Sequence, residues 1–479
     1  MSAKAKISRR ALLRASAITA GGAVVAACAP APAPQAPAAE APVAEAPAAE
    51  APAAEAPAAE GEVKTLEVVW RTNLQEQPLL EQEFAQFEED NPGVVINATF
   101  MPGEEFDQKV DLMIAAGTPP AIWAPIAARG IRYYAARDLC MELDPFIERD
   151  SYDLTDFYEG SLDLCKWKEK WVGLPMLLVP IHMVYNKTLF EEAGVPEPTK
   201  DWDDKAWNWD AFVATAQKLT KQDDSGNTTQ YGFGGWGDPR YDIRNFGVNY
   251  FSKEDQDAGY PTKFLGTTPE FIEALQFMGD VINKYKIAPT VAETQAMQGG
   301  APDIFMTGKI AMARAGTWVF QTFADIEDFQ WGTAAIPWPN RLERWNWLYP
   351  DQYAIIRGQK YPDEAWELLK QLASAEGEKL HPIQSFGALG PRQSVADYFV
   401  EVSMQTSGQP EEEIQPAIDG MKYMSTAPGH ATVEWQQYWE KAFQPSMDKV
   451  LMGTMPAADA VNEMEPIFNQ IMEETTPAS

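Results

Sequence analysis

A five-residue repeat near the N-terminus limits the part of this chain that can fold. Between Cys28 and Gly61 the sequence consists almost wholly of Pro, Ala and Glu, and the unit A-P-A-A-E places an acidic residue at every fifth position. Such a segment has no large apolar side chains to bury, and its prolines favour extended conformations. We therefore expect residues 28–61 to form a stalk of on the order of 100 Å. The folded body should comprise residues 62–479.

The residues before the stalk have the pattern of an export signal. Basic residues that include Arg9 and Arg10 precede a short run of small and apolar residues, which ends directly before Cys28. Paired arginines are typical of a twin-arginine signal, and small residues before a cysteine are typical of a lipoprotein cleavage site. We predict that residues 1–27 are removed and that Cys28 carries lipid. The alternative is an N-terminal anchor helix, but residues 15–27 fall short of the roughly 20 apolar residues that a membrane span needs.

The charge of the chain excludes one large class of functions. The formal net charge is −32, and removal of residues 1–27 would make the remainder more negative, because that segment contains basic but no acidic residues. The sequence has no basic run, zinc-finger spacing or RNA-binding aromatic motif that would offset this charge. We therefore expect no nucleic-acid partner, and we attribute the acidity to solubility outside the cell.

The cysteine count fits an exported lipoprotein. If Cys28 carries lipid, an even pair remains, Cys140 and Cys165, in a compartment that permits oxidation. The pair could form a disulfide. Two buried free thiols are the alternative, since small buried cysteines are common, and the sequence leaves both open.

The body has the pattern of an α/β protein, with expected strands at 66–70 and 94–100. Apolar residues at helical spacing follow each of these strands, around 80–87 and 106–114, and a short run at 121–123 comes next. This alternation predicts an open, mostly parallel sheet, in which ligands bind beyond the carboxyl ends of the strands. Further amphipathic helices are expected at three places: 208–221, 365–372 and 461–471.

Several motifs follow one another in a fixed order along the body. They are A-A-G-T-P-P at 115–120, Y-N-K-T-L-F-E-E-A-G-V-P at 185–196, W-D-A-F at 209–212, D-D-S-G at 223–226 before Y-G-F at 231–233, F-M-T-G-K-I-A-M at 305–312, G-T-W at 316–318 and L-G-P-R at 389–392. In this order they resemble the family 1 extracellular solute-binding proteins of ABC importers, the class of the maltose-binding protein. The resemblance covers the whole body.

The resemblance implies a two-lobe periplasmic-binding-protein fold of the α/β class, with hinge crossovers and an interlobe ligand cleft. Mapped onto this chain, the crossovers lie near 179–180, near 335–337 and after 373. The lobe boundaries therefore become 62–180 plus 335–373 for lobe 1 and 181–334 plus 374–479 for lobe 2. Binding should shift such lobes from open to closed, and the importer then distinguishes the two states.

The ligand that the resemblance implies is a sugar or oligosaccharide, which needs aromatic rings for its C–H face. Of the tryptophans in expected loops, Trp318 matches the Gly-x-Trp position of the family, and Trp338 would face the cleft near a crossover. Trp236 is a further candidate, and so is Trp123, because Ala121 stands where many relatives carry Asp. A tryptophan is nevertheless more often a core residue than a binding residue.

The polar edge of a sugar needs charged and amide side chains. Glu76 follows the first strand, Asp238 follows Trp236, and Asp351 precedes an apolar run. Arg392 follows Pro391, and it could equally fix a loop by pairing with carboxylates across the lobe interface. Each of these residues has a surface role as its alternative.

Two rival functions stay open at this point. An anchored carbohydrate-active hydrolase is one, although the chain has only three histidines and no H-E-x-x-H, G-x-S-x-G or phosphate-loop motif. An adhesive or scaffold lipoprotein is the other. Asp223 to Asn227 loosely resembles a calcium loop, but its spacing is wrong for one and a turn fits better. We therefore expect no enzyme activity, no metal and no cofactor.

We expect a monomer that is exported and anchored to a membrane through its N-terminal lipid. Its partners would be a permease and an ATPase subunit of an ABC importer, and the body would face the periplasm or the outside of the cell. The sequence does not identify the sugar.

Overall fold

The computed structural model describes residues 62–71, 76–124, 129–297, 299–340, 342–426 and 431–476. The chain divides into two units, Met1–Glu60 and Gly61–Ser479, and all described residues belong to the second. The expected export signal, Cys28 and the stalk lie outside the described residues. The fold below is that of the body.

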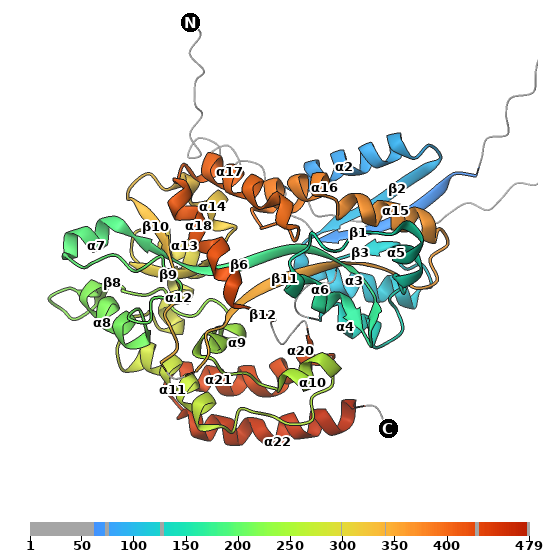
Figure 1. Cartoon of the computed structure of the whole chain (residues 1–479). Coiled ribbons are helices and arrows are strands. Elements are labelled where there is room, and N and C mark those ends of the chain that lie inside the picture. Colours follow the sequence, from blue (N-terminus) through green and yellow to red (C-terminus); the bar gives the residue numbers. More distant parts are fainter. Residues whose placement is uncertain are drawn as a thin grey trace, which may run out of the picture. The chain divides into compact units, whose positions relative to one another are not determined.

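One mixed sheet runs through the body (Figure 1). Its strand order is β10-β6-β11-β3-β1-β2, with β9 paired to β6 and β12 paired to β11. The strands are β1 (Lys64–Arg71), β2 (Val94–Met101), β3 (Ile122–Trp123), β6 (Leu174–Asn186), β9 (Met312–Gly316), β10 (Trp331–Ala334), β11 (Asn346–Ile355) and β12 (Met424–Thr426). Two small hairpins lie apart from this sheet: β4 (Lys166–Trp167) with β5 (Lys170–Trp171), and β7 (Lys221–Gln222) with β8 (Thr228–Gln230).

The two longest of these strands, β6 and β11, cross from one half of the body to the other (Figure 1). The first part of β6 pairs with β11 up to Pro180, and the second part pairs with β9 from Ile181 and with β10. All three partners run antiparallel to β6, whereas β1 pairs in parallel with β2 and β3. The expectation of a mostly parallel sheet is therefore wrong, because the crossing strands introduce antiparallel pairs.

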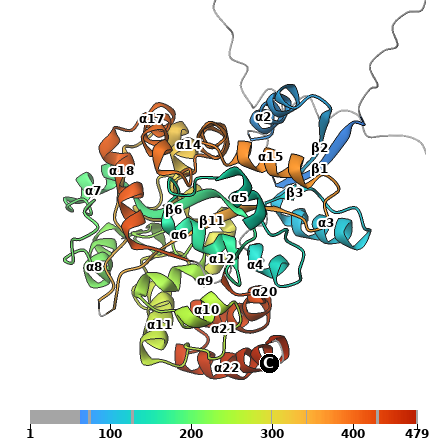
Figure 2. The same cartoon turned by 45° about the vertical axis from the view of Figure 1, so that its right-hand side comes forward.

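Helices cover the sheet and build most of the second half. In the first half they are α2 (Gln77–Asp90), α3 (Gly103–Ala115), α4 (Gly130–Ala135), α5 (Asp144–Asp150), α6 (Glu159–Leu162), α15 (Pro362–Leu372) and, beside α15, α16 (Ala375–Glu378). In the second half they are α7 (Lys187–Ala193), α8 (Trp209–Leu219), α9 (Pro239–Asp242), α10 (Lys253–Ala258), α11 (Pro269–Asn283), α12 (Val291–Met297), α13 (Ala301–Phe305), α14 (Val319–Thr322), α17 (Ala396–Ser407), α18 (Glu411–Asp419), α20 (Trp435–Tyr438), α21 (Gln444–Leu451) and α22 (Ala457–Thr475). Helices α11, α21 and α22 lie side by side in Figures 1 and 2.

The predicted helices agree closely with the structure where apolar residues recur at helical spacing over a long segment. The expected helix at 208–221 is α8, and the side chain of Asn208 accepts hydrogen bonds from the backbone N–H groups of Asp210 and Ala211 as its N-cap. The motif at 185–196 forms the end of β6 and then α7. Asn186 caps the start of α7, and Gly194 ends it with a φ of 61°, a left-handed conformation that glycine adopts without strain.

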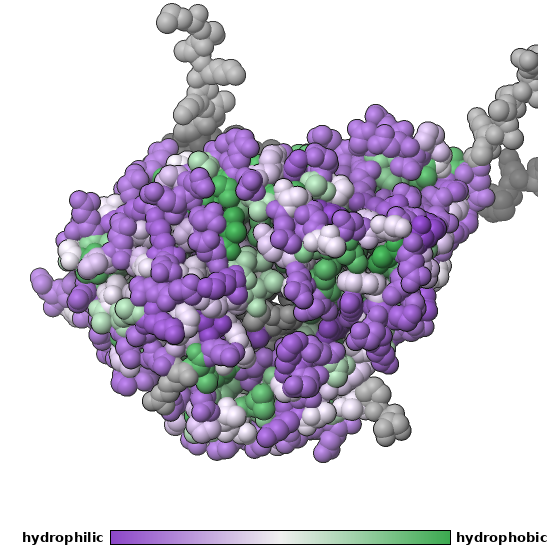
Figure 3. Space-filling model, viewed as in Figure 1, coloured by the Kyte–Doolittle hydropathy of each residue, from purple (hydrophilic) through white to green (hydrophobic). Residues whose placement is uncertain are grey.

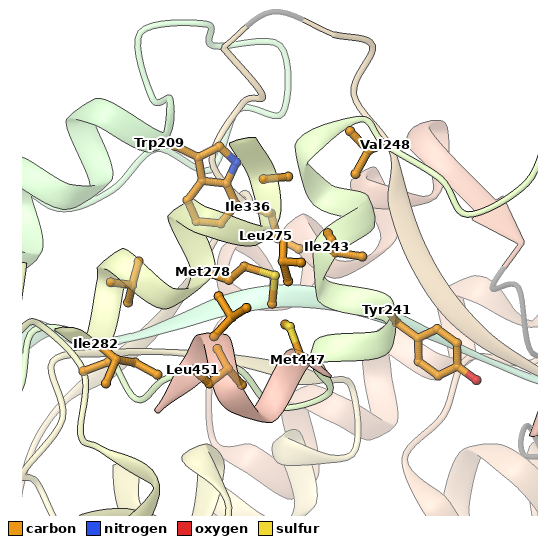
Figure 4. Close-up of a cluster of buried hydrophobic side chains, with 14 of the residues drawn as sticks. Trp209, Tyr241, Ile243, Val248, Leu275, Met278, Ile282, Ile336, Met447 and Leu451 are labelled. Atoms are coloured by element: carbon orange, nitrogen blue, oxygen red, sulfur yellow. The ribbon is translucent and has the colours of Figure 1, made fainter. Parts of the chain in front are cut away.

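The buried side chains of the described residues form four clusters, which we group into a first-lobe core of two clusters and a second-lobe core of two. The first-lobe core packs around β1, β3 and α15 and includes Leu66, Trp70 and Trp366. The second-lobe core is larger and includes Leu275, Met278, Ile336 and Met447, which Figure 4 shows between Trp209 and Leu451. Because burial of this much apolar surface is the main favourable term in folding, each core can hold its own lobe together.

The core in which each side chain packs can be compared with the predicted lobe boundaries. Near the predicted boundary at 180, Val179 of β6 packs in the first-lobe core and Ile181 in the second-lobe core. Ala335 and Ile336 still pack in the second-lobe core, and the chain next crosses along β11. The limits at 335 and 373 stay a prediction.

The described residues include the cysteine pair and the stretch from Asp223 to Asn227, for which the sequence left alternatives. Cys140 and Cys165 are both buried free thiols, so the alternative of a disulfide between them is excluded in this structure. Asp223 accepts hydrogen bonds from the backbone N–H groups of Ser225 and Asn227, which makes this stretch a turn between β7 and β8. Within the described ranges, no group of His, Cys, Asp and Glu side chains is arranged to hold a metal ion. No helix in the described part of the chain is long and apolar enough to cross a membrane.

The buried His182 of β6 gives the fold a pH dependence. Its ring is fully buried and stacks on the ring of Phe320. Burial lowers the pKa of His182 from 6.5 to about 4. Between these two pH values His182 is protonated in the unfolded chain but neutral in the folded chain. The free energy of unfolding therefore falls as the solution is acidified.

We predict that His182→Phe weakens this pH dependence. Phenylalanine keeps the stacked ring but does not titrate, so the variant should lose about 1–2 kcal/mol less stability than the parent between pH 6.5 and pH 5. Urea unfolding at both pH values measures the difference. His381, whose pKa burial lowers to about 3, remains in both proteins and is the common background. Equal losses in parent and variant would contradict the prediction.

Candidate functional site

A cavity of about 190 Å³ lies where β6, β9 and β11 meet α9. Two of the side chains that line it were candidates from the sequence, Asp238 and Trp318. Its walls also include Ile181, Asp242, Arg314 and Tyr349, together with the start of α13 at Ala301 and Pro302. Trp318 and Tyr349 both pack against the first-lobe and the second-lobe core. The cavity therefore lies at the junction of the two lobes.

Trp318 owes its position to Gly316. A Cβ atom at Gly316 would overlap the indole ring of Trp318 and the side chain of Val179. The ring therefore lies over the end of β9 in a place that any other residue at 316 would fill. Trp318 is only partly buried, and its ring centroid is 6.4 Å from that of Tyr349. The Gly-x-Trp motif thus presents a flat apolar surface to the cavity.

Asp238 is the centre of a hydrogen-bonded group. Arg240 donates to both of its carboxylate oxygens, from Nε at 2.8 Å and from Nη2 at 2.7 Å, and the hydroxyl of Tyr349 donates at 3.2 Å. Burial and the charge of Asp238 raise the pKa of Tyr349 well above its usual range, so the hydroxyl stays protonated. These hydrogen bonds fix the direction of the Asp238 carboxylate.

A second charged pair lies deeper. The guanidinium of Arg314, on β9, forms an ion pair with the carboxylate of Asp242, on α9, and both side chains are almost completely buried. The other oxygen of Asp242 accepts a hydrogen bond of 3.2 Å from the backbone N–H of Asp238. This pair therefore links β9 to the turn that carries Asp238, and it positions one wall of the cavity.

The arrangement is suited to binding a polar molecule with a flat face. A carboxylate can accept about four hydrogen bonds, and the three donors above leave Asp238 capacity for a donor on a ligand. Trp318 and Tyr349 supply ring surface next to it. The volume lies below the roughly 300–1,000 Å³ of pockets that enclose a drug-sized ligand, so a single ring fits and a longer molecule would extend beyond the cavity.

Two other candidate tryptophans lie in the cores. Trp236 donates from Nε1 to the carbonyl of Met278 at 3.0 Å and packs against Trp209, Phe233 and Phe246. Trp123 is fully buried, with its ring edge-to-face on Tyr134. Neither lines the cavity.

Two further candidates lie in separate clusters. Trp338 is partly buried beside Tyr423 and the guanidinium of Arg344. Arg392 donates to the carbonyl of Ala373 and the hydroxyl of Tyr152, each at 2.7 Å. It also lies 3.3 Å from a carboxylate oxygen of Asp156 and 3.6 Å from one of Glu378. These contacts match the loop-fixing alternative for Arg392.

The last two candidates lie near the carboxyl end of β1. Asp351, on β11, lies 3.2 Å from Nη2 of Arg71, the final residue of β1. Glu76 is mostly buried and directly precedes α2. Both remain predictions as ligand contacts, and the predicted lipid attachment at Cys28 lies outside the described residues.

Sequence reasoning missed Tyr349, Arg314, Asp242 and Arg240. A charge within an apolar strand is a usable signal, because a buried charge needs a partner, and Arg314 lies in the run M-A-R-A-G of β9. Tyr349 has no such signal. Its place at the cavity depends on the pairing of β11 with β6, which the sequence does not show.

Comparison with protein families identifies relatives of this chain. The family model described as bacterial extracellular solute-binding protein matches residues 71–379. A protein of Brucella abortus that is named as a binding protein is 25% identical over 396 residues, which cover 80% of this chain and 90% of that protein. A Brucella suis protein of the same description matches to the same extent.

Solved structures share the fold. An ABC substrate-binding protein from Listeria monocytogenes, in complex with cycloalternan, has a TM-score of 0.72 at 22% identity, with 86% of this chain and 99% of that chain covered. The cyclic α-maltosyl-1,6-maltose binding protein from Arthrobacter globiformis has a TM-score of 0.69 at 21% identity, with 86% and 100% covered. The expected two-lobe α/β fold is confirmed.

We predict that Arg314→Met destabilises the body by about 3–5 kcal/mol, because it leaves the carboxylate of Asp242 buried without its partner. The double variant Arg314→Met, Asp242→Asn should recover at least half of this loss. Urea unfolding of the parent, both single variants and the double variant completes the cycle. Lys253→Met, which breaks the exposed pair with Asp257, is the matched control and should cost far less. A loss below about 1 kcal/mol for the Arg314 variant would show that the pair does not hold this wall.

Proposed function

The chain belongs to the bacterial extracellular solute-binding proteins, and on that basis we propose that it captures a sugar or oligosaccharide for an ABC importer. The observation that carries the proposal is the cavity at the junction of the lobes. There Trp318 lies over Gly316, beside the carboxylate of Asp238 and the ring of Tyr349.

The chemistry of this cavity fits a carbohydrate. A sugar ring has a C–H face that packs on an aromatic ring and hydroxyl groups that donate and accept at its edge. Trp318 offers the ring, and Asp238 offers an acceptor that Arg240 and Tyr349 already orient. A site of this kind needs no rearrangement of its polar groups when the ligand enters, which reduces the free-energy cost of binding.

The solved neighbours include several complexes with oligosaccharides and one with a single sugar. Cycloalternan, mannobiose and maltotriose are bound in three of them, a fourth is a binding protein for a cyclic maltosyl-maltose, and another holds α-D-tagatose. In this chain the cavity holds about one ring, so an oligosaccharide would place one unit there and extend the others along the surface between the lobes. The other proposed contacts, Glu76 and Asp351, would lie on the first-lobe side.

Ligand capture would be coupled to lobe movement. Strands β6 and β11 connect the lobes, and their pairing changes at Pro180. We infer that this region acts as the hinge and that a bound sugar favours the closed state, which a permease with its ATPase would recognise. The protein would act as a monomer, since one lobe pair forms a complete site.

A hydrolase is less well supported by the geometry. Glycosidases need one carboxylic acid whose pKa is raised so that it can protonate the leaving group. The two carboxylates that line the cavity instead each contact a guanidinium group, Asp238 that of Arg240 and Asp242 that of Arg314, which is not the apolar environment of such an acid. A receptor without enzyme activity, cofactor or metal is therefore our proposal.

We predict that an oligosaccharide stabilises the purified protein against thermal unfolding. The test ligands are maltose, maltotriose and mannobiose, and amino acids serve as controls that should not bind. A ligand at 100 times its dissociation constant adds about 2.7 kcal/mol to stability, and calorimetry would give the affinity. Trp318→Leu should weaken binding about tenfold or more, through loss of the stacking surface.

Trp338→Leu is the matched control for this experiment, because it removes an equally large, partly exposed ring outside the cavity. Its affinity should stay within about twofold of the parent. Release of product sugars during the measurement would move the assignment to a hydrolase. Equal affinity of the parent and the Trp318 variant would remove the cavity from the proposal.

We also propose that Cys28 anchors the protein to a membrane after removal of residues 1–27. Cys28→Ala should leave the protein uncleaved or release it into the soluble fraction, because lipid attachment needs the thiol. Radioactive palmitate labelling and fractionation of expressing cells measure both outcomes. Arg9→Lys with Arg10→Lys should block export through a twin-arginine route. Membrane association that survives Cys28→Ala would instead support the anchor helix.

A further inference from the structure

A second and larger cavity lies apart from the one described above. It has a volume of about 640 Å³, within the range of small-molecule sites. Its walls come from both lobes, with Leu164 and Arg132 on one side and Arg244, Phe251 and Trp345 on the other. Figure 3 shows the surface hollowed near the centre of this face, close to the place of β12 in Figure 1.

Arg244 is the unusual residue of this cavity. It lies on the short 3-10 turn η2 (Ile243–Phe246), and only 3% of its surface is exposed. Its Nε and Nη1 atoms are buried and have no hydrogen-bond acceptor among the described residues. The centroid of the Trp345 ring lies 5.3 Å from its guanidinium carbon.

An arginine in this state is costly to the folded protein. Burial lowers the pKa of Arg244 to about 10, which shows how strongly the surroundings oppose its charge. A buried donor without an acceptor costs free energy, and a charged donor costs more. The neighbouring carboxylate of Asp242 does not help, because it pairs with Arg314. An anion in the cavity would supply the missing acceptor.

Arg132 adds a second positive charge to the same walls. It lies on α4, and it donates to backbone carbonyls of Asp163, Gln256 and Ala431. These carbonyls accept from its Nη1 and Nη2 atoms but carry no net charge that would neutralise the guanidinium. The walls of the cavity therefore include two buried guanidinium groups, although the protein as a whole is strongly acidic.

The rim of the cavity limits the charge of an occupant. Its carboxylates are all exposed at the surface: Asp163, Asp257, Glu270 and Glu343. They would repel a second negative charge on a ligand. Apolar side chains fill much of the remaining wall, with Leu164, Phe251 and Met424 among them. A ligand with one anionic group and an apolar body matches this distribution.

We propose that this cavity is a binding site for a small organic monocarboxylate, whose carboxylate contacts Arg244 and whose body packs against Trp345 and Phe251. The site is separate from the sugar cavity. The segment of α9 and η2 divides them, since Asp238 and Asp242 line the first cavity and Arg244 and Gly247 line the second. The proposal does not depend on the sugar function.

Thermal unfolding of the purified protein with benzoate tests this site. Benzamide is the matched neutral probe, with the same ring and nearly the same shape, and sodium chloride controls for ionic strength. We expect 10 mM benzoate to raise Tm by about 1–3 °C and benzamide to have no effect. Glucuronate, a monocarboxylate with a polar body, should bind at least tenfold more weakly than benzoate. No shift with benzoate, an equal shift with benzamide or tighter binding of glucuronate would each overturn the proposal.

Variants of single residues test whether benzoate contacts Arg244. Arg244→Gln should lower the affinity for benzoate at least tenfold in calorimetry, and Arg244→Lys should retain part of it. Lys253→Gln removes an exposed cation from the rim of the same cavity and should change the affinity less than twofold. Trp318→Leu, in the sugar cavity, should leave benzoate binding unchanged. Equal losses in the Arg244 and Lys253 variants would show general charge attraction and would overturn the proposed contact.

Discussion

Every residue of β6 is buried, and the body depends on how this strand meets its hydrogen-bonding needs. Buried backbone groups must be paired, so β6 needs neighbours along its whole length. No single strand supplies them. β11 pairs with its first part and β9 and β10 with its second, and the change falls between Pro180 and Ile181. Ile181, Tyr349 and the Gly316–Trp318 turn gather at that change, so the cavity that they line lies where the sheet passes from one lobe to the other.

The sequence predicted local structure better than contacts across the fold. Helices such as α8, with its Asn208 cap, follow from spacing and capping residues that lie within one segment. Trp318 was predictable because its motif also sets its local geometry. Tyr349 was not, because it reaches the cavity only through the pairing of β11 with β6. The mostly parallel sheet was predicted from the first strands alone, but β6 and β11 add antiparallel pairs to it.

The burial of individual tryptophans and arginines could not be predicted from residue type alone. Trp123 and Trp236 had the loop positions of binding residues, yet both pack in the cores, because an indole ring gains more from burial than from exposure. Arginines are usually surface residues, but Arg132, Arg244 and Arg314 are each less than a tenth exposed. Backbone carbonyls accept from Arg132 and a carboxylate pairs with Arg314, whereas two buried guanidinium nitrogens of Arg244, Nε and Nη1, have no acceptor in the described part of the chain.

The overlap between position 316 and the Trp318 ring restricts how this receptor can change through evolution. A substitution at 316 displaces the ring, and a smaller residue at 318 leaves empty space that no single replacement at 316 would fill with the same flat surface. The two positions can therefore diverge only together. New ligand preferences would arise more readily at the opposite wall, around Tyr349 and the start of α13, where a side chain can be exchanged without moving a strand.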